Sequence, residues 1–195
     1  PPRSTLFPYT TLFRSRNMIV RKRIVTLENS EIPIRLYNVI TIIAQLHGAD
    51  CYGDILEQLE YKEKGIGAEL IYPRFAAAML RIGDVLDVEN NRFSTYSVKN
   101  MIQMPTTSQI HLLKHQSISH IVITDEDIKL EAVSSDIEVC KCARQWFDLV
   151  DQETKELIYS WNEIAPPELC GCKLKRSICN VYYVNKRNNK AADTL

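Results

Sequence analysis

Apolar residues recur every three or four positions in three stretches of the first half of the chain. This spacing is typical of helices with one buried face, and it predicts helices over residues 30–47, 51–61 and 68–82. Apolar and polar residues then alternate on both sides of an Asn-Asn pair, which predicts a β-hairpin over residues 85–98. Three helices followed by a hairpin are the element order of a winged helix.

The second half of the chain carries a different pattern. Residues 101–118 are polar and contain a proline, so they are interpreted as a linker, with a helical turn at residues 109–115 as an alternative within it. Alternation predicts short strands over residues 120–124 and 128–133. A helix is expected from Ser134 or Ser135 as far as Ile164, either straight or kinked near Asp151, before the strand 178–184.

The predicted fold class is therefore α+β, with a winged helix-turn-helix domain followed by a smaller α/β C-terminal region. The predicted divisions are a basic arm (residues 16–30), the winged-helix domain (31–100) and the linker (101–118). The C-terminal region (119–185) and a disordered tail (186–195) follow.

Residues 1–15 have a different interpretation. Their sequence, PPRSTLFPYTTLFRS, reads as the in-frame translation of a sequencing-library adapter, and we expect it to be an artefact that contributes nothing to the fold. Met18 is a plausible start, and further upstream residues are an equal alternative.

The charge balance limits the classes of function. The whole chain has 24 basic and 24 acidic residues, and without residues 1–15 its net charge is about −2. Residues 125–168 carry 12 acidic and 4 basic residues, whereas residues 173–190 carry 6 basic and no acidic ones. Near neutrality argues against nonspecific coating of nucleic acid, and it leaves room for a local basic site.

Several clusters in residues 36–98 resemble the PadR family of winged-helix transcriptional regulators. The most specific is Gly67-Ala68-Glu69-Leu70-Ile71-Tyr72-Pro73, which is similar to that family's Gly-Thr-Leu-Tyr-Pro at the start of its recognition helix. His47-Gly48 with Tyr52-Gly53-Asp54-Ile55-Leu56, the turn Met79–Val85 and the stretch Phe93–Val98 add weaker similarities. The resemblance implies a DNA-binding transcriptional regulator.

A winged helix places its third helix in the major groove and its wing on the phosphate backbone. On that basis Arg74 is expected to reach base edges, and other polar residues to contact phosphates or the groove. The predicted DNA-binding residues are Tyr72, Arg74, Arg81, Asn91, Arg92, Tyr96 and Lys99.

Residues 32–100 carry 7 basic and 9 acidic residues, which keeps a second hypothesis open. In that alternative the winged helix is a protein-interaction adaptor in a larger complex and binds no DNA. The expected partners are double-stranded DNA, or a homodimer or protein partner through residues 134–164, and no membrane.

The cysteines and histidines suggest no catalytic or metal chemistry. The pairs Cys140/Cys142 and Cys170/Cys172, with Cys179, have a spacing poorly suited to zinc, and Cys140 and Cys142 would point about 200° apart on a helix. We therefore expect reduced thiols in a cytoplasmic protein, with no enzyme activity, no cofactor and no metal. A metal-stabilised C-terminal module is the third alternative.

Overall fold

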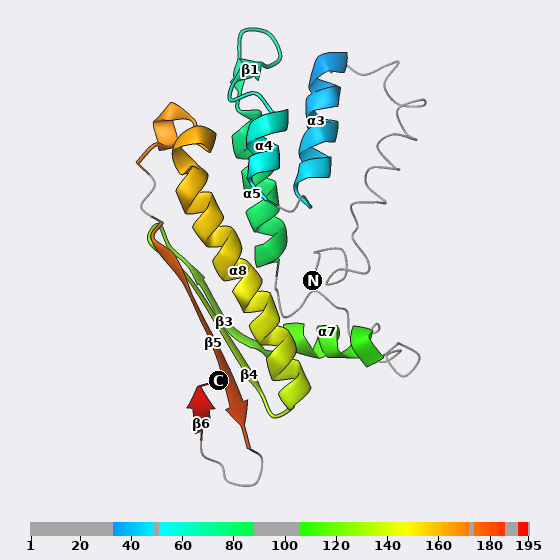
Figure 1. Ribbon diagram of the computed structural model, residues 1–195, viewed down its shortest axis with the longest axis vertical. Coiled ribbons are helices and arrows are strands. Elements are labelled where there is room, and N and C mark those ends of the chain that lie inside the picture. Colours follow the sequence, from blue (N-terminus) through cyan, green and yellow to red (C-terminus); the bar gives the residue numbers. More distant parts are fainter. Residues whose placement is uncertain (1–32, 49–50, 88–105, 172–173, 186–190, 195) are drawn as a thin grey trace. The chain divides into compact units, whose positions relative to one another are not determined.

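The computed structural model describes residues 33–48, 51–87, 106–171, 174–185 and 191–194 (Figure 1). The chain is a mixed α+β protein, as the sequence predicts. It divides into two compact units that interleave along the sequence. Unit 1 comprises residues 1–84 and 159–172, and unit 2 comprises residues 85–158 and 173–195. Residues 1–15, 16–30 and most of the predicted hairpin lie outside the described residues.

Unit 1 begins with two helices, close to where the sequence predicts them. Helix α3 spans Ile34–Leu46 and buries Leu36, Val39 and Leu46, which lie along one of its faces. Helix α4 spans Gly53–Gln58, and its Ile55 is completely buried. Because α4 has only six residues, tertiary packing of this side chain must stabilise it more than helix propensity does.

The segment before the third helix forms a short ribbon, where the sequence suggested a turn and the first helical residues. Strands β1 (Glu63–Lys64) and β2 (Leu70–Ile71) pair in antiparallel orientation. Gly67 has a φ of 68°, a left-handed conformation that glycine adopts without strain. Helix α5 follows over Pro73–Leu86, and proline is favoured at the first position of a helix because its missing N–H needs no partner there.

The predicted hairpin over residues 85–98 is wrong at its beginning. Val85 and Leu86 belong to helix α5, and Val85 is buried. The indole N–H of Trp146 donates to the Val85 carbonyl at 3.0 Å, which holds this end of the helix in place. Residues 88–98 lie outside the described part of the chain. The described order is thus helix, helix, ribbon, helix.

Unit 2 contains a four-stranded mixed sheet in the order β3-β4-β5-β6. The strands are β3 (Ile118–Ile123), β4 (Asp127–Ser134), β5 (Arg176–Val184) and β6 (Ala191–Thr194). β3–β4 and β5–β6 are antiparallel, whereas β4 and β5 are parallel. The predicted strands at 120–124, 128–133 and 178–184 are confirmed, and β6 lies inside the tail that was expected to be disordered.

Helix α8, which spans Ile137–Ile164, lies between the two parallel strands along the chain (Figure 1). The short 3-10 helix η2 (Pro167–Leu169) follows it. The N-terminal cap of α8 is Asp136, whose carboxylate accepts the backbone N–H of Glu138 at 2.8 Å, rather than Ser134 or Ser135. The helix continues without a break through Asp151, so the straight alternative holds. Pro166 follows its end, as the sequence predicts.

The predicted linker contains helix α7, Thr106–Ser117. This helix forms because part of it is buried, since Leu112 is only 2% exposed and Lys114 only 1%. Buried positions on β4 alternate through Ile128, Leu130 and Ala132, and helix α8 contributes the remaining core of unit 2 with side chains such as Phe147 and Val150. The helical turn expected at residues 109–115 lies inside this longer helix.

No helix among the described residues is both long enough and apolar enough to cross a membrane.

Candidate functional site

Three of the seven predicted DNA-binding residues belong to the described part of the chain. Tyr72 precedes helix α5, and Arg74 and Arg81 lie on it. The other four, Asn91, Arg92, Tyr96 and Lys99, lie outside the described residues. Each of the three described residues makes contacts within unit 1.

The guanidinium of Arg74 connects the ends of two helices. Its Nε donates to the Leu59 carbonyl at 2.7 Å and one Nη donates to the Leu56 carbonyl at 2.8 Å. The other Nη lies 3.5 Å from the Glu163 carbonyl. These acceptors are at the C-termini of α4 and α8, where carbonyls lack helical partners and the helix dipole favours a cation. Arg74 is therefore occupied as a helix cap, which contradicts its predicted role in reaching base edges.

Arg81 is completely buried, so its predicted contact with phosphate is wrong in this structure. Its guanidinium carbon lies 4.8 Å from the centre of the Tyr52 ring, a cation–π geometry. Ala77, Arg81 and Val85 follow one another at four-residue spacing and are all buried. Residues four apart lie on the same helix face. In the sequence, the apolar residues four positions before and after Arg81, Ala77 and Val85, are the signal that Arg81 faces the core.

Tyr72 is half-buried and packs edge-to-face against Tyr61, with ring centres 5.7 Å apart. The Tyr61 hydroxyl donates to the Ala165 carbonyl at 2.8 Å. Phe75 and Trp161 form a second edge-to-face pair at 6.1 Å. These aromatic contacts join the start of α5 to the end of α8 within unit 1, so Tyr72 has a packing role.

The cysteines of α8 point in different directions, as the helical spacing predicts. The Cys140 thiol is directed at the Ser134 and Tyr182 carbonyls, at 3.7 and 3.9 Å. The Cys142 sulfur instead lies 3.7 Å from Nδ1 of His111 on α7. Among the described residues, no group of three or more His, Cys, Asp or Glu side chains converges to hold a metal ion.

The Cys142–His111 pair resembles a nucleophile and its base, but its charge state is unsuitable for that chemistry. Burial raises the pKa of Cys142 although Lys114 acts in the opposite direction. Burial, reinforced by Lys114, lowers the pKa of His111. Both shifts favour a neutral thiol beside a neutral imidazole. Cysteine nucleophiles react as thiolates, so this pair is held in an unreactive state.

Thiol reactivity provides a direct check of these environments. Burial raises the pKa of Cys179 to about 11, and burial also raises the pKa of Cys140. Cys51 and Cys170 are exposed. We expect iodoacetamide at pH 7.5 to modify Cys51 and Cys170 at least tenfold faster than Cys140 or Cys179, as measured by peptide mass spectrometry. Equal rates in the native protein would contradict this arrangement.

Two histidines predict how stability depends on pH. Burial lowers the pKa of His47 from 6.5, although Asp84 acts against it, and burial likewise lowers that of His111. Below about pH 6.5 the histidines of the unfolded chain bind protons that the native histidines do not. Their contribution to the free energy of unfolding is therefore fully present above this pH, and it is lost as the pH falls towards the native pKa values. Urea unfolding at pH 5.5 and 7.5 measures the difference.

Variants that lack these histidines separate their contribution to the pH dependence of stability from that of carboxylates, which titrate at lower pH. The double variant His47→Gln/His111→Gln is expected to lose less stability than the wild type between pH 7.5 and 5.5. His120→Gln, at an exposed position, serves as the control and is expected to behave as the wild type. Identical pH dependence in all three proteins would exclude this explanation.

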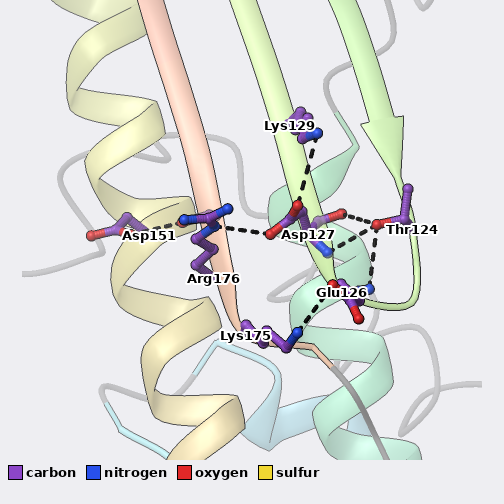
Figure 2. Close-up of polar contacts among 8 residues, drawn as sticks. Thr124, Glu126, Asp127, Lys129, Asp151, Lys175 and Arg176 are labelled. Carbon is purple, nitrogen blue, oxygen red and sulfur yellow. Dashed lines mark hydrogen bonds and ion pairs between the residues drawn. The ribbon is translucent and has the colours of Figure 1, made fainter.

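A cluster of ion pairs lies where β4 and β5 begin (Figure 2). Asp127 accepts a hydrogen bond from Nε of Arg176 at 3.0 Å and lies 3.8 Å from the Lys129 ammonium. Glu126 pairs with Lys175 at 3.0 Å. Asp127 and Arg176 are direct neighbours in the parallel register. Because surface pairs contribute only about 0–1 kcal/mol each, we interpret the cluster as fixing strand register rather than as a binding site.

A second carboxylate connects helix α8 to the same end of β5. Asp151 accepts hydrogen bonds from the Ser177 hydroxyl at 2.7 Å and from the Lys155 ammonium at 2.5 Å. Burial acts to raise the pKa of Asp151, but these two hydrogen bonds outweigh it and lower the pKa. The Ser177 hydroxyl donates a hydrogen bond to a carboxylate that stays ionised, and this bond attaches strand β5 to helix α8.

An apolar surface remains at the edge of the sheet. Ile121 and Ile123 of β3 are 40% and 59% exposed, although their cross-strand neighbours Leu130 and Ile128 are buried. We refer to Ile121 and Ile123 as the β3 ledge. The sequence does not reveal this surface, because alternation of apolar and polar residues identifies a strand without telling which of its apolar residues will be covered.

A family model described as HD-CE matches residues 13–156. The match therefore extends through the predicted winged helix, the predicted linker and most of helix α8. No curated protein and no solved structure matches the chain.

Proposed function

We propose that this chain, which belongs to the HD-CE family, is a protein-interaction module of a larger complex, with no DNA-binding or catalytic role. The observation that carries this proposal is the internal use of Arg74 and Arg81. One caps two helices and the other is buried, so neither guanidinium is displayed to a phosphate backbone.

The charge balance supports the same proposal. Residues 32–100 contain 7 basic and 9 acidic residues, and two of the basic ones are the occupied arginines. Proteins that hold a duplex usually present a basic face that neutralises several phosphates. The apolar β3 ledge, by contrast, is a feature of surfaces that bind protein.

The winged-helix fold of residues 31–100 is part of this proposal. Helices α3, α4 and α5 supply three helices in the expected order. The resemblance to PadR regulators gives the competing function, in which Asn91, Arg92, Tyr96 and Lys99 bind DNA and the protein regulates transcription.

Duplex binding separates the two functions. We expect no change in the fluorescence anisotropy of a labelled random-sequence duplex at about 50 mM salt, where phosphate contacts are strong. Salt-dependent binding by the wild type that is lost in the Arg92→Ala/Lys99→Ala variant would replace the adaptor with the DNA-binding function. These two side chains are suitable because both are among the residues that the sequence predicts to contact DNA.

Co-purification tests the adaptor itself. Tagged full-length protein, recovered from nuclease-treated extracts of its own cells, is expected to retain a stoichiometric protein partner at about 150 mM salt. Recovery of the chain alone, together with no duplex binding, would refute the adaptor. Nuclease treatment excludes partners that are held only through nucleic acid.

A further inference from the structure

Four aromatic side chains of unit 1 gather where helix α5 begins and helix α8 ends. They are Tyr61, Tyr72, Phe75 and Trp161, and we refer to them as the aromatic corner. Tyr61 packs against Tyr72 and Phe75 against Trp161, with the ring planes at 75° and 79° to each other. All four are half-buried, whereas the core residue Phe147 is completely buried. The corner therefore keeps part of its ring surface in contact with solvent.

The two aromatic pairs form one surface because they join the same two segments. Tyr72 and Phe75 are three residues apart at the start of α5, and residues at this spacing lie on the same side of a helix. Ala165 directly follows α8, and its N–H donates to the Trp161 carbonyl at 2.8 Å. The Tyr61 hydroxyl donates to the Ala165 carbonyl, also at 2.8 Å. Both pairs thus lie between residues 72–75 and 161–165.

The rings of the corner offer their faces rather than their polar atoms. The Tyr61 hydroxyl is already bonded to a carbonyl, and the Trp161 indole N–H donates to the Leu169 carbonyl at 3.0 Å. The face of an aromatic ring is the negative part of its quadrupole and attracts cations. Rings that stand nearly perpendicular to each other allow one cation to contact more than one ring, as in the aromatic cages that bind ammonium groups.

A carboxylate lies beside these rings. Glu168 belongs to η2, between Ala165 and Leu169, whose carbonyls hold the side chains of Tyr61 and Trp161. Glu168 is exposed, and its carboxylate forms no ion pair or hydrogen bond with any residue that the structure describes. Desolvation raises the pKa of Tyr61, and the charge of Glu168 raises it further, so this carboxylate is within electrostatic reach of the ring.

The other charges near the corner also favour a cation. Residues 159–172, the whole second segment of unit 1, contain two acidic residues and no basic one. Helix α8 ends in this segment without a basic residue in its last turn, and the C-terminus of a helix attracts positive charge. Arg74 is the positive charge nearby, and its guanidinium is directed at main-chain carbonyls. Next to Tyr61 in the sequence, Glu60 and Glu63 outnumber Lys62.

We therefore propose that the aromatic corner, together with Glu168, binds an arginine side chain of a partner protein. A guanidinium is planar and weakly hydrated, so it can stack on ring faces while its N–H groups donate to a carboxylate. Lysine has a compact, strongly hydrated charge and matches this combination less well. This inference rests on the proposed adaptor function and names the chemistry by which the partner is recognised.

A nuclear magnetic resonance titration of the full chain tests the proposal, with the blocked tripeptide Gly-Arg-Gly as the probe. The chain has two tryptophans, so the indole N–H signals of Trp161 and Trp146 can be followed together. We expect millimolar peptide to shift the Trp161 signal in a saturable manner and to leave the Trp146 signal in place. The Trp161→Phe variant identifies which signal belongs to the corner.

Matched peptides and variants define what is recognised. The same peptide with citrulline has nearly the shape of arginine without its charge, and it is expected to bind about tenfold more weakly. Glu168→Gln removes an exposed charge, and it is expected to weaken binding of the arginine peptide about threefold. Asp148→Asn removes another exposed carboxylate, thirteen positions before Trp161 on α8, and is expected to leave binding unchanged. Tyr72→Leu is expected to weaken binding about fivefold through loss of one ring.

Several outcomes overturn the inference. A Trp161 signal that does not move with the arginine peptide, or that moves equally with the citrulline peptide, would reject a guanidinium site. Equal binding by Glu168→Gln, Tyr72→Leu and the wild type would place the peptide elsewhere. A Gly-Lys-Gly peptide that binds as tightly would overturn the choice of arginine.

Co-purification distinguishes failure of this inference from failure of the adaptor function. A partner that is recovered equally with the wild type and with the Glu168→Gln/Tyr72→Leu variant would leave the adaptor function standing and reject the arginine site. A partner recovered with the wild type and with Asp148→Asn, but lost from the double variant, would support both.

Discussion

Replacing Arg81 with alanine is expected to lower the free energy of unfolding by about 3–5 kcal/mol, the range found when large buried side chains are truncated. The side chain is 0% exposed, so its stem fills core volume that no neighbouring residue recovers. The substitution also removes the cation–π contact with Tyr52, which contributes about 0.5–2 kcal/mol. Urea denaturation followed by circular dichroism measures the change.

Two further variants identify the cause of this loss. Arg81→Met keeps much of the volume without the charge, and it is expected to recover part of the stability if packing dominates. Lys62→Ala removes an exposed positive charge from the same unit and is expected to change stability by less than about 0.5 kcal/mol. If Arg81→Ala were as stable as the Lys62 variant, Arg81 would not be a core residue.

Replacing Arg74 with alanine is expected to cost about 2–3 kcal/mol, because hydrogen bonds from a charged donor contribute about 1.5–3 kcal/mol and loss of the donor leaves carbonyls unsatisfied. The Leu56 and Leu59 carbonyls would lose their contacts at 2.8 and 2.7 Å. The value is below the sum of these contributions because the site is half-buried and water replaces part of the lost bonding. The urea midpoint at constant m-value is the readout.

Arg74→Lys provides the matched comparison. Lysine keeps the charge near the helix C-termini but cannot reproduce the planar set of donors, so we expect it to restore less than half of the lost stability. An Arg74→Ala protein with wild-type stability and weakened duplex binding would instead support the sequence-based interpretation of Arg74 as a DNA contact.

The surroundings of Arg74 and Arg81 explain why the sequence alone assigned both residues to DNA contact. Helical periodicity placed Arg74 and Arg81 on a helix over residues 68–82, and both do lie on helix α5, although this helix begins later, at Pro73. The same pattern assumes that a charged residue faces solvent, and this fails where small neighbours such as Ala77 leave room for an arginine stem. Arg74 offered no local signal, because its acceptors are main-chain carbonyls as far away in sequence as Glu163.

Local pattern was a better guide in unit 2. The alternation of Ile128, Leu130 and Ala132 determined strand β4 and its buried face, because successive residues of a strand point to opposite sides. The divergence of Cys140 and Cys142 also followed from helix geometry, and the structure confirms it. Helix α7 is longer than the helical turn expected within the linker, and tertiary contacts bury its Lys114 and His115, although both are polar.

By itself the sequence determined the mixed α+β class, most of the helices and the strands of the sheet, since these depend on spacing between near neighbours. Only the tertiary structure decided that the end of α8, from Tyr159 onward, belongs to unit 1 and that Arg74 and Arg81 make their contacts inside this unit. It also decided that Ile121 and Ile123 are exposed. Each of these depends on which distant segments meet, and burial is a property of the assembled chain rather than of any short stretch.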